Sequence, residues 1–330
     1  MTAARGYLRY TAGKLGGAAV SLLAVLVTSF FLFRIIPGDP VKALTHGTPT
    51  TAGQLASLRR QFGLDEPLWR QFTEYCAKAL TGDLGISYQF RAPVGELIAE
   101  KAPATLLLTG VAVLVYSAVG LWLGARSAWR HGGLGDRINT GVALTLWSVP
   151  SFWLGLLLII TFSVGVGPVP GLFPTGGMES GDATGTGLGY AIDVAHHMVL
   201  PVLTLVAVGY AQTLLVMRSS LLDEMGGDYL TTARAKGLRD AVVRRRHAVP
   251  NALLPTVTMI FINLGHVAAG SILVETVFSW PGVGGLFYQA LSVPDLPLVQ
   301  GLFMVFAGAM ILMNLLADLV YPLLDPRVRR

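Results

Sequence analysis

The chain has 330 residues, of which 53% are apolar and only 13% are charged, and its formal net charge is +5. Soluble domains carry about a quarter charged residues, so this composition indicates a polytopic membrane protein rather than an ordinary soluble fold. Its Lys and Arg residues gather in particular loops, a pattern that sets membrane topology and argues against nucleic acid as a partner. The single cysteine, Cys76, excludes an intrachain disulfide and a metal site of several cysteines.

The first apolar run is predicted to be a retained transmembrane helix. Residues 1–14 form a basic N-terminus, and the span covers residues 15–36. Its apolar part is longer than the core of a cleaved signal peptide, about 7–15 residues, and Pro37 ends the helix.

Residues 37–103 are polar and mixed, and we expect them to form an external segment with short helices. Apolar residues have helical spacing at Gln54–Phe62 and at Pro67–Leu80. The cluster Gly82-Asp83-Leu84-Gly85 predicts a turn.

Residues 104–319 are predicted to be the core transmembrane domain, followed by a tail at 320–330. The third span is interrupted at Pro150. With the first span, the fold is therefore an all-α bundle of six transmembrane helices. The five later spans are expected at about 105–123, 140–164, 198–217, 254–278 and 298–319.

The distribution of basic residues predicts which way the chain crosses the membrane. The N-terminus, the loop 126–137, the segment 218–253 and the tail are all basic and fall on one side of a six-span arrangement. The loops on the other side, at 165–197 and 279–297, contain no Lys or Arg. Positive residues mark the cytoplasmic side, so both termini and the segment 218–253 are expected there.

No pattern in the chain predicts catalysis, a metal site or a bound cofactor. There is no P-loop, and the glycines around Gly185–Gly189 follow no predicted strand. His196 and His197 are adjacent, so their side chains diverge on a helix and make a poor metal site. We therefore predict no catalytic residue and no resident cofactor.

A few polar residues lie within the predicted spans, where they are costly unless they face protein or water. Asn263 and His266 share one helix face, and with Glu275 and Asn314 they are candidates to line a translocation path. The alternative for each is a hydrogen bond between helices. For Glu275 the alternative is a brace for the external loop, and for Asp318 it is pairing with a basic residue. The absence of a chain of acids disfavours a proton- or sodium-coupled carrier.

The cytoplasmic segment from Asp228 to Pro255 is predicted to form a helix–Gly–helix hairpin. A short helix to Lys236 ends at Gly237, which suits a left-handed position, and a second helix from Asp240 to Ala248 stops before Pro250. The alternative is a basic loop held against anionic lipid headgroups. The placement of small residues favours docking to a partner, because Ala233, Ala235 and Gly237 allow another backbone to approach.

This segment resembles the EAA loop of ABC importer permeases, whose pattern is Glu-Ala-Ala, three residues, Gly, nine residues and Ile-x-Leu-Pro. Gly237 matches the glycine, Ala233 the second alanine and Val249-Pro250 the final pair. Thr231 and Thr232 stand where the pattern has Glu and the first Ala. The version Thr-Ala-Arg-Ala-Lys-Gly-Leu is similar to that of the dipeptide/oligopeptide/nickel permeases.

The resemblance extends over nearly the whole chain and is typical of the first permease subunit, which has a long segment after its first span. Further matching motifs are Pro37-Gly38-Asp39-Pro40, Gly82-Asp83-Leu84-Gly85, Pro150-Ser151-Phe152-Trp153-Leu154-Gly155, Glu275-Thr276-Val277-Phe278-Ser279-Trp280-Pro281-Gly282 and Leu324-Asp325-Pro326-Arg327.

The resemblance implies the type I ABC importer permease fold and half of the translocation path of a peptide importer in the bacterial cytoplasmic membrane. The implied partners are a second homologous permease, two cytoplasmic ATPases that hold ATP and Mg, an external solute-binding protein and the lipid bilayer. An outer loop with Trp280, Pro281 and Gly282 is expected to enter the binding protein. The residues expected to couple to the ATPases are Asp228, Tyr229, Thr232, Ala233, Arg234, Ala235, Lys236, Gly237, Leu238 and Pro250.

Two other classes of function are compatible with the sequence. One is an intramembrane enzyme with His266 or His197 as base, and another is a channel or secondary carrier. Within the family, nickel, glutathione or another oligopeptide-like compound competes with dipeptides as the substrate.

Overall fold

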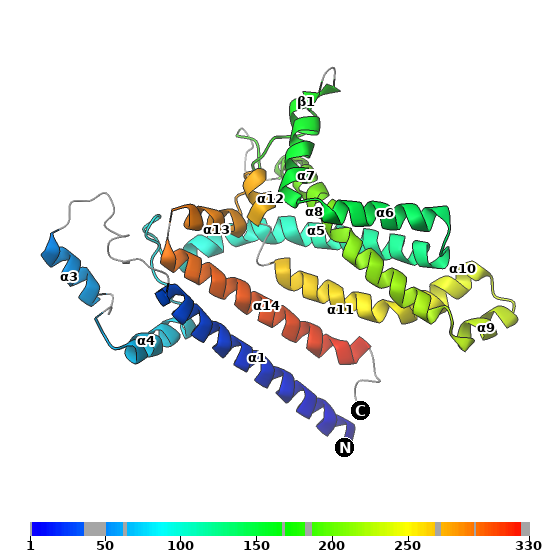
Figure 1. Ribbon diagram of the computed structural model, residues 1–330, viewed down its shortest axis with the longest axis horizontal. Coiled ribbons are helices and arrows are strands. Elements are labelled where there is room, and N and C mark those ends of the chain that lie inside the picture. The colour runs from blue at the N-terminus through cyan, green and yellow to red at the C-terminus, as the bar shows by residue number, and fades with distance from the viewer. Residues whose placement is uncertain are drawn as a thin grey trace.

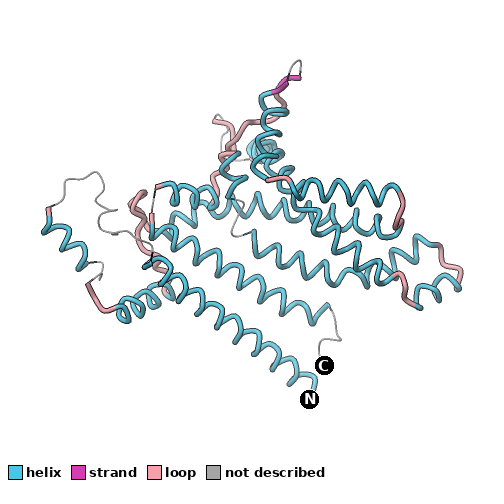
Figure 2. The backbone as a smooth tube through the Cα atoms, in the orientation of Figure 1, coloured by secondary structure: helices cyan, strands magenta, loops and turns pink. Residues whose placement is uncertain are grey.

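The computed structural model describes residues 2–35, 51–61, 65–166, 169–181, 187–267, 272–293 and 295–324. Long helices run alongside one another, with short helices at both ends of the bundle (Figures 1 and 2). In chain order the described elements are α1 (Thr2–Ile35), α3 (Ala52–Gln61), α4 (Leu68–Leu80), α5 (Val94–Trp129), α6 (Leu134–Ser148), α7 (Ser151–Leu158), η1 (Ile159–Val164), β1 (Gly165–Val166), β2 (Val169–Pro170), α8 (Leu188–Glu224), α9 (Asp228–Ala235), α10 (Asp240–Val243), η2 (Arg244–Ala248), α11 (Val249–Val267), α12 (Ile272–Val277), α13 (Val283–Ser292) and α14 (Leu296–Leu324).

The helices confirm an all-α polytopic membrane fold. Among the described residues, five helices are long and apolar enough to cross a membrane, and a bent pair makes a sixth if it counts as one span. Two helices are much longer than the predicted spans. α5 begins at Val94, and α8 begins at Leu188, inside the predicted loop 165–197. Polar residues at helix ends can stay helical beyond the lipid, so apolar runs alone underestimate helix length.

The third predicted span is interrupted at Pro150, as expected, but its two parts do not continue in one direction. α6 and the following helices α7 and η1 are bent by 100° at this point. Val149, just before the proline, has an extended backbone with ψ 128°, because the proline ring disfavours a helical conformation there. The second part, with β1, therefore rises away from the bundle (Figure 1).

Two described helices fall in the predicted fifth span, 254–278. They are α11, which begins at Val249, and α12, which ends at Val277, and residues 268–271 lie outside the described part of the chain.

The close packing of α5 against α8 depends on two glycines four residues apart in α5. A Cβ at Gly120 would lie 2.6 Å from Cβ of Thr213, and a Cβ at Gly124 would lie 2.6 Å from the backbone oxygen of Leu214. Small residues at this spacing let two membrane helices approach closely. Gly120 and Gly124 form a Gly-x-x-x-Gly pattern that can be read from the sequence alone.

The segment 37–103 contains the two predicted helices, α3 and α4. The α4 phenol Tyr75 donates a hydrogen bond to Oγ of Ser29 at 3.0 Å, so α4 is held against α1. Gly82 and Gly85 both have positive φ, which confirms the predicted turn.

The predicted alternative for Asp318 is confirmed. Nζ of Lys14 in α1 lies 2.9 Å from Oδ1 of Asp318 in α14, so the acid pairs with a basic residue.

Candidate coupling site

The predicted left-handed turn at Gly237 is present between α9 and α10. Gly237 has φ +74°. Its N–H donates to the oxygen of Arg234 at 2.9 Å, and the N–H of Leu238 donates to the oxygen of Ala233 at 3.4 Å. This pair of bonds is a Schellman motif, which satisfies the last carbonyls of α9 and reverses the chain. The hairpin lies at the end of the bundle where α1 begins and α14 ends (Figure 1).

The prediction that the second helix stops before Pro250 is wrong. α10 passes through the π-helical turn η2 directly into α11, so Pro250 is the second residue of a helix. The N–H of Val249 bonds to the oxygen of Arg244, five residues back. A wider turn accommodates a residue that lacks an N–H and would clash with the carbonyl four residues before it.

One face of the hairpin packs into its own chain. Leu230, Ala233 and Val243 are buried in a cluster with Ala128 of α5 and Leu221 of α8. The expectation that the Ala233 side chain contacts a partner is therefore wrong, because it is 5% exposed and fills this interior. The other predicted coupling residues are exposed, namely Asp228, Tyr229, Thr232, Arg234, Ala235, Lys236, Gly237, Leu238 and Pro250.

Tyr229 carries a polar contact at the start of the hairpin. Its hydroxyl donates a hydrogen bond to the carboxylate of Glu224. Partial burial, together with this carboxylate, raises the pKa of the Tyr229 phenol, so the group stays a neutral donor.

The hairpin is also tied to the end of α5. The indole Nε1 of Trp129 donates a hydrogen bond to Oδ2 of Asp240 at 2.7 Å. The guanidinium of Arg234 lies 5.8 Å from the centre of the Trp129 ring, and its Nε lies 3.6 Å from Oδ1 of Asp240. Sequence reasoning missed Trp129 and Asp240, since no local pattern shows that a residue 111 positions away is its partner.

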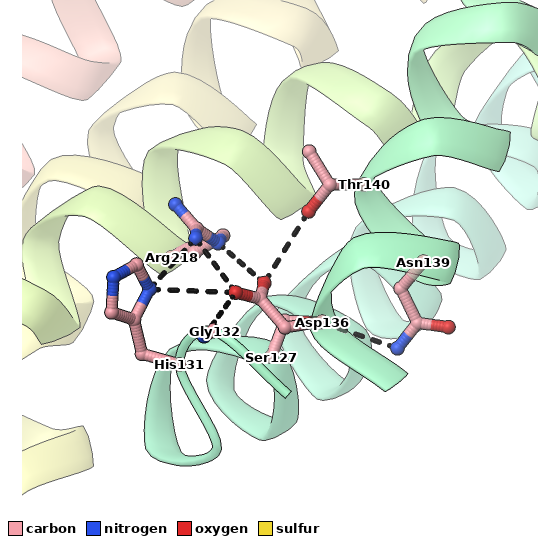
Figure 3. A network of polar contacts seen from close by, with 7 residues as sticks. All are labelled: Ser127, His131, Gly132, Asp136, Asn139, Thr140 and Arg218. Atoms are coloured by element: carbon pink, nitrogen blue, oxygen red, sulfur yellow. Dashed lines mark hydrogen bonds and ion pairs between the residues drawn. The ribbon is translucent and has the colours of Figure 1, made fainter. Parts of the chain in front are cut away.

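A second network, also missed, joins α6 to α8 (Figure 3). Asp136, 4% exposed, accepts from Nε and Nη2 of Arg218 at 2.7 and 2.8 Å and from the N–H of Gly132 at 2.9 Å. His131 Nδ1 lies 2.9 Å from Arg218 Nη2. The sequence did offer one indication of this network, because Asp136 is an acidic residue just before the predicted third span.

Of the three predicted loop residues Trp280, Pro281 and Gly282, the first and the last are buried. Trp280 is 2% exposed and its Nε1 donates to the oxygen of Ala104 at 2.9 Å. Gly282 is also buried, and a Cβ there would lie 2.3 Å from Oε2 of Glu275. Trp280 and Gly282 therefore pack inside this chain, whereas Pro281 is exposed, and the expected entry of this loop into a binding protein stays a prediction.

Four residues were candidates to line the translocation path. Asn263 lines a cavity, whereas Glu275 is not among the residues that line it. Glu275 is fully buried and accepts bonds from Thr105 and the start of α13, which matches the alternative of a brace. Asn314 is exposed on α14, and the side chain of His266 lies outside the described part. The cavity, about 290 Å³, is lined by Thr109, Ala112, Val113, Tyr116, Ser151, Leu205, Val208, Gly209, Asn263 and Val267.

His196 and His197 contact backbone oxygens. His197 Nδ1 lies 2.9 Å from the oxygen of Asp193, and His196 Nε2 lies 3.0 Å from that of Leu172. Within the described residues, no three His, Cys, Asp or Glu side chains are grouped so that they could hold a metal ion. These contacts hold both imidazole rings against backbone oxygens of the same chain.

Two family models match the chain in succession. Residues 7–109 match the N-terminal part of the membrane component of binding-protein-dependent transport systems, and residues 118–330 match the inner membrane component of these systems.

Curated relatives cover nearly the full length. The chain is 38% identical to the dipeptide transport system permease protein DppB of Escherichia coli K12, over 98% of this chain and 99% of the relative. It is 36% identical to the di/tripeptide permease DppB of Pseudomonas aeruginosa UCBPP-PA14 and 36% identical to the glutathione permease GsiC of Salmonella choleraesuis SC-B67, with the same shares covered. The chain therefore belongs to the family of inner membrane components of binding-protein-dependent transport systems, the type I ABC permeases.

Proposed function

We propose that this chain is one permease subunit of an ATP-driven importer of di- or oligopeptides. It would form half of the translocation path beside a second, homologous permease. The observation that carries the proposal is the hairpin around Gly237, with one face packed on α5 and α8 and the other exposed. The relatives named for dipeptides, di/tripeptides and glutathione support a peptide-like substrate.

The exposed hairpin face would dock on cytoplasmic ATPases, which hold ATP and Mg. It offers an aromatic ring, two cations and a small-residue turn: Tyr229, Arg234, Lys236 and Gly237. Closure of the ATPases would move the hairpin, and rigid-body rocking of the bundle would alternate access between the two sides. The proposed orientation places both termini and the hairpin in the cytoplasm, in agreement with their basic residues.

The cavity beside Asn263 is the proposed part of the path within this subunit. Its polar lining comes from side chains that carry no formal charge, such as Thr109, Ser151 and Asn263. Such a lining can pass peptides of different sequence without holding any one of them tightly. An external solute-binding protein would then set most of the substrate choice.

Reconstitution tests this function. The chain would be co-purified with its second permease, ATPases and binding protein and placed in vesicles. We expect uptake of a labelled dipeptide that requires ATP and the binding protein. Competition by glutathione or Ni²⁺ would compare the substrate classes. Uptake that persists without ATP would contradict the proposal and favour a channel or secondary carrier.

A further inference from the structure

Asp136 is held by contacts from two parts of the chain. Its carboxylate, in the first turn of α6, accepts from the N–H of Gly132 at 2.9 Å and so ties the preceding turn to the helix. Arg218 adds a bidentate contact from another helix, at 2.7 and 2.8 Å. Bidentate guanidinium–carboxylate pairs restrict geometry as well as distance. The pair therefore holds the start of α6 at one position relative to α8.

Arg218 also lies close to the hairpin along the chain. α8 ends at Glu224 and α9 begins at Asp228. The short connection is itself hydrogen bonded, because the N–H of Met225 donates to Leu221 and the N–H of Gly227 donates to Glu224, both at 3.0 Å. The hairpin is therefore joined to the helix of Arg218 by a short connection that is itself hydrogen bonded.

The turn between α5 and α6 is also contacted by the hairpin, at the end where α5 finishes. Trp129 closes α5 and bonds Asp240 of α10, and Gly132 in the turn bonds Asp136. The turn therefore lies between two contacts, and both lead to the hairpin. From there α6 runs to the break at Pro150, and Ser151, the next residue, lines the cavity of Asn263.

We propose that Asp136 and Arg218 are a positioning pair that makes α6 move with the coupling hairpin, so that hairpin motion reaches the cavity through Ser151. This proposal rests on the proposed function of the hairpin. It assigns the pair a role in transmission, whereas a purely structural pair would only stabilise the fold.

A distance measurement tests the proposal without any transport assay. Nitroxide labels would be placed at Leu134, which is 75% exposed at the start of α6, and at Ala241, which is exposed on α10 and is not one of the proposed docking residues, in a Cys76→Ser background of the intact complex. We expect one narrow distance distribution, the same with and without ATP. In the double variant Asp136→Asn/Arg218→Gln, which leaves no unpaired buried charge, the distribution should broaden or shift with ATP. An unchanged distribution in that variant would overturn the proposal.

The coupling ratio gives an independent readout in vesicles that contain the same complex. The double variant and Arg218→Lys should hydrolyse more ATP per peptide transported, by about 5-fold or more, because coupling free energies of this kind are typically 5–150-fold effects. The matched control is Lys14→Gln/Asp318→Asn, which removes an ion pair that joins α1 to α14 and should leave the ratio unchanged.

The outcomes separate the two proposals. A wild-type complex without ATP-dependent uptake would refute the proposed function, and this inference with it. Wild-type uptake together with an unchanged ratio in the Asp136 and Arg218 variants would overturn the positioning role alone. A proportional loss of hydrolysis and uptake, with less complex recovered, would indicate a purely structural pair and also overturn it.

Discussion

Thr105 in α5 donates a hydrogen bond from its hydroxyl to Oε1 of Glu275 in α12, at 2.9 Å, although the two residues lie 170 positions apart. Oε2 of the same carboxylate accepts from the N–H groups of Gly284 and Gly285, at 2.8 and 3.1 Å. Since Glu275 is fully buried, this carboxylate joins α5, α12 and the beginning of α13 into one unit. The unit explains why a charged residue is tolerated there.

Replacing Glu275 should weaken this unit. Glu275→Ala leaves the buried N–H groups of α13 without an acceptor, which costs about 1–3 kcal/mol per unsatisfied group. We expect a lower midpoint of thermal unfolding in detergent, with Glu275→Gln intermediate because its amide oxygen still accepts. Glu100→Gln, on a side chain that is 67% exposed, is the control. Equal midpoints for Glu275→Ala and the control would contradict the brace.

The α5–α8 contact should be sensitive to one methyl group. Gly124→Ala would bring Cβ to 2.6 Å from the backbone oxygen of Leu214, so the two helices must separate. Gly110→Ala on the same helix meets nothing within 4 Å and is the matched control. We expect less folded protein and a lower unfolding midpoint for Gly124→Ala alone. The same yield and midpoint for both variants would show that close approach is not required.

Substitutions at Gly237 can distinguish the effect of backbone strain from the effect on docking. Gly237→Val should destabilise the hairpin by about 1–2 kcal/mol, because a left-handed backbone disfavours side chains with a Cβ. Asn tolerates this conformation better. Gly237→Asn and Gly237→Asp have nearly the same shape, so a difference between them reports the charge.

We expect Gly237→Asp to insert normally but to uncouple ATP hydrolysis from uptake, since docking on the proposed ATPases would bury a charge. The measurement is co-purification of the ATPases together with the ATP used per peptide. Full transport by Gly237→Asp would argue against docking at this turn.

The Trp129–Asp240 bond should behave as a coupled pair. Trp129→Phe removes the donor but keeps an aromatic ring beside Arg234, and Asp240→Ala removes the acceptor. Each change should speed hydrogen exchange in residues 228–243, and the double variant should exchange no faster than the more affected single variant, with a coupling energy of about 1 kcal/mol. Additive effects would mean that the bond contributes nothing to holding the hairpin.

The cavity beside Asn263 can be probed with thiol reagents, because Cys76 is the single native cysteine. In a Cys76→Ser background, Asn263→Cys should react with a small polar reagent, and transported peptide should slow the reaction. Leu108→Cys, at a fully buried position of α5, should stay unmodified. A rate of Asn263→Cys modification that transported peptide leaves unchanged, under conditions of active transport, would remove this cavity from the path.

Much of the fold was predictable because its determinants are local. Apolar runs located the membrane helices, and basic loops predicted one common side for the termini and the hairpin. The turn at Gly237 was also predictable, since a glycine after a short helix favours a left-handed backbone. The helix through Pro250 was not, because the π-helical turn that accommodates the proline depends on how the following helix packs.

The tertiary structure decided which faces meet. The same sequence pattern that predicted docking by Ala233 and Gly237 could not tell that Ala233 faces α5 and α8 while Gly237 faces outward. The pairs Asp136–Arg218 and Thr105–Glu275 are 82 and 170 positions apart. Periodicity and capping act over a few residues, whereas burial and long-range pairing depend on how whole helices are arranged. The sequence by itself therefore determined the membrane helices and the family, and only the packed bundle decided which of its polar residues brace the structure and which remain exposed.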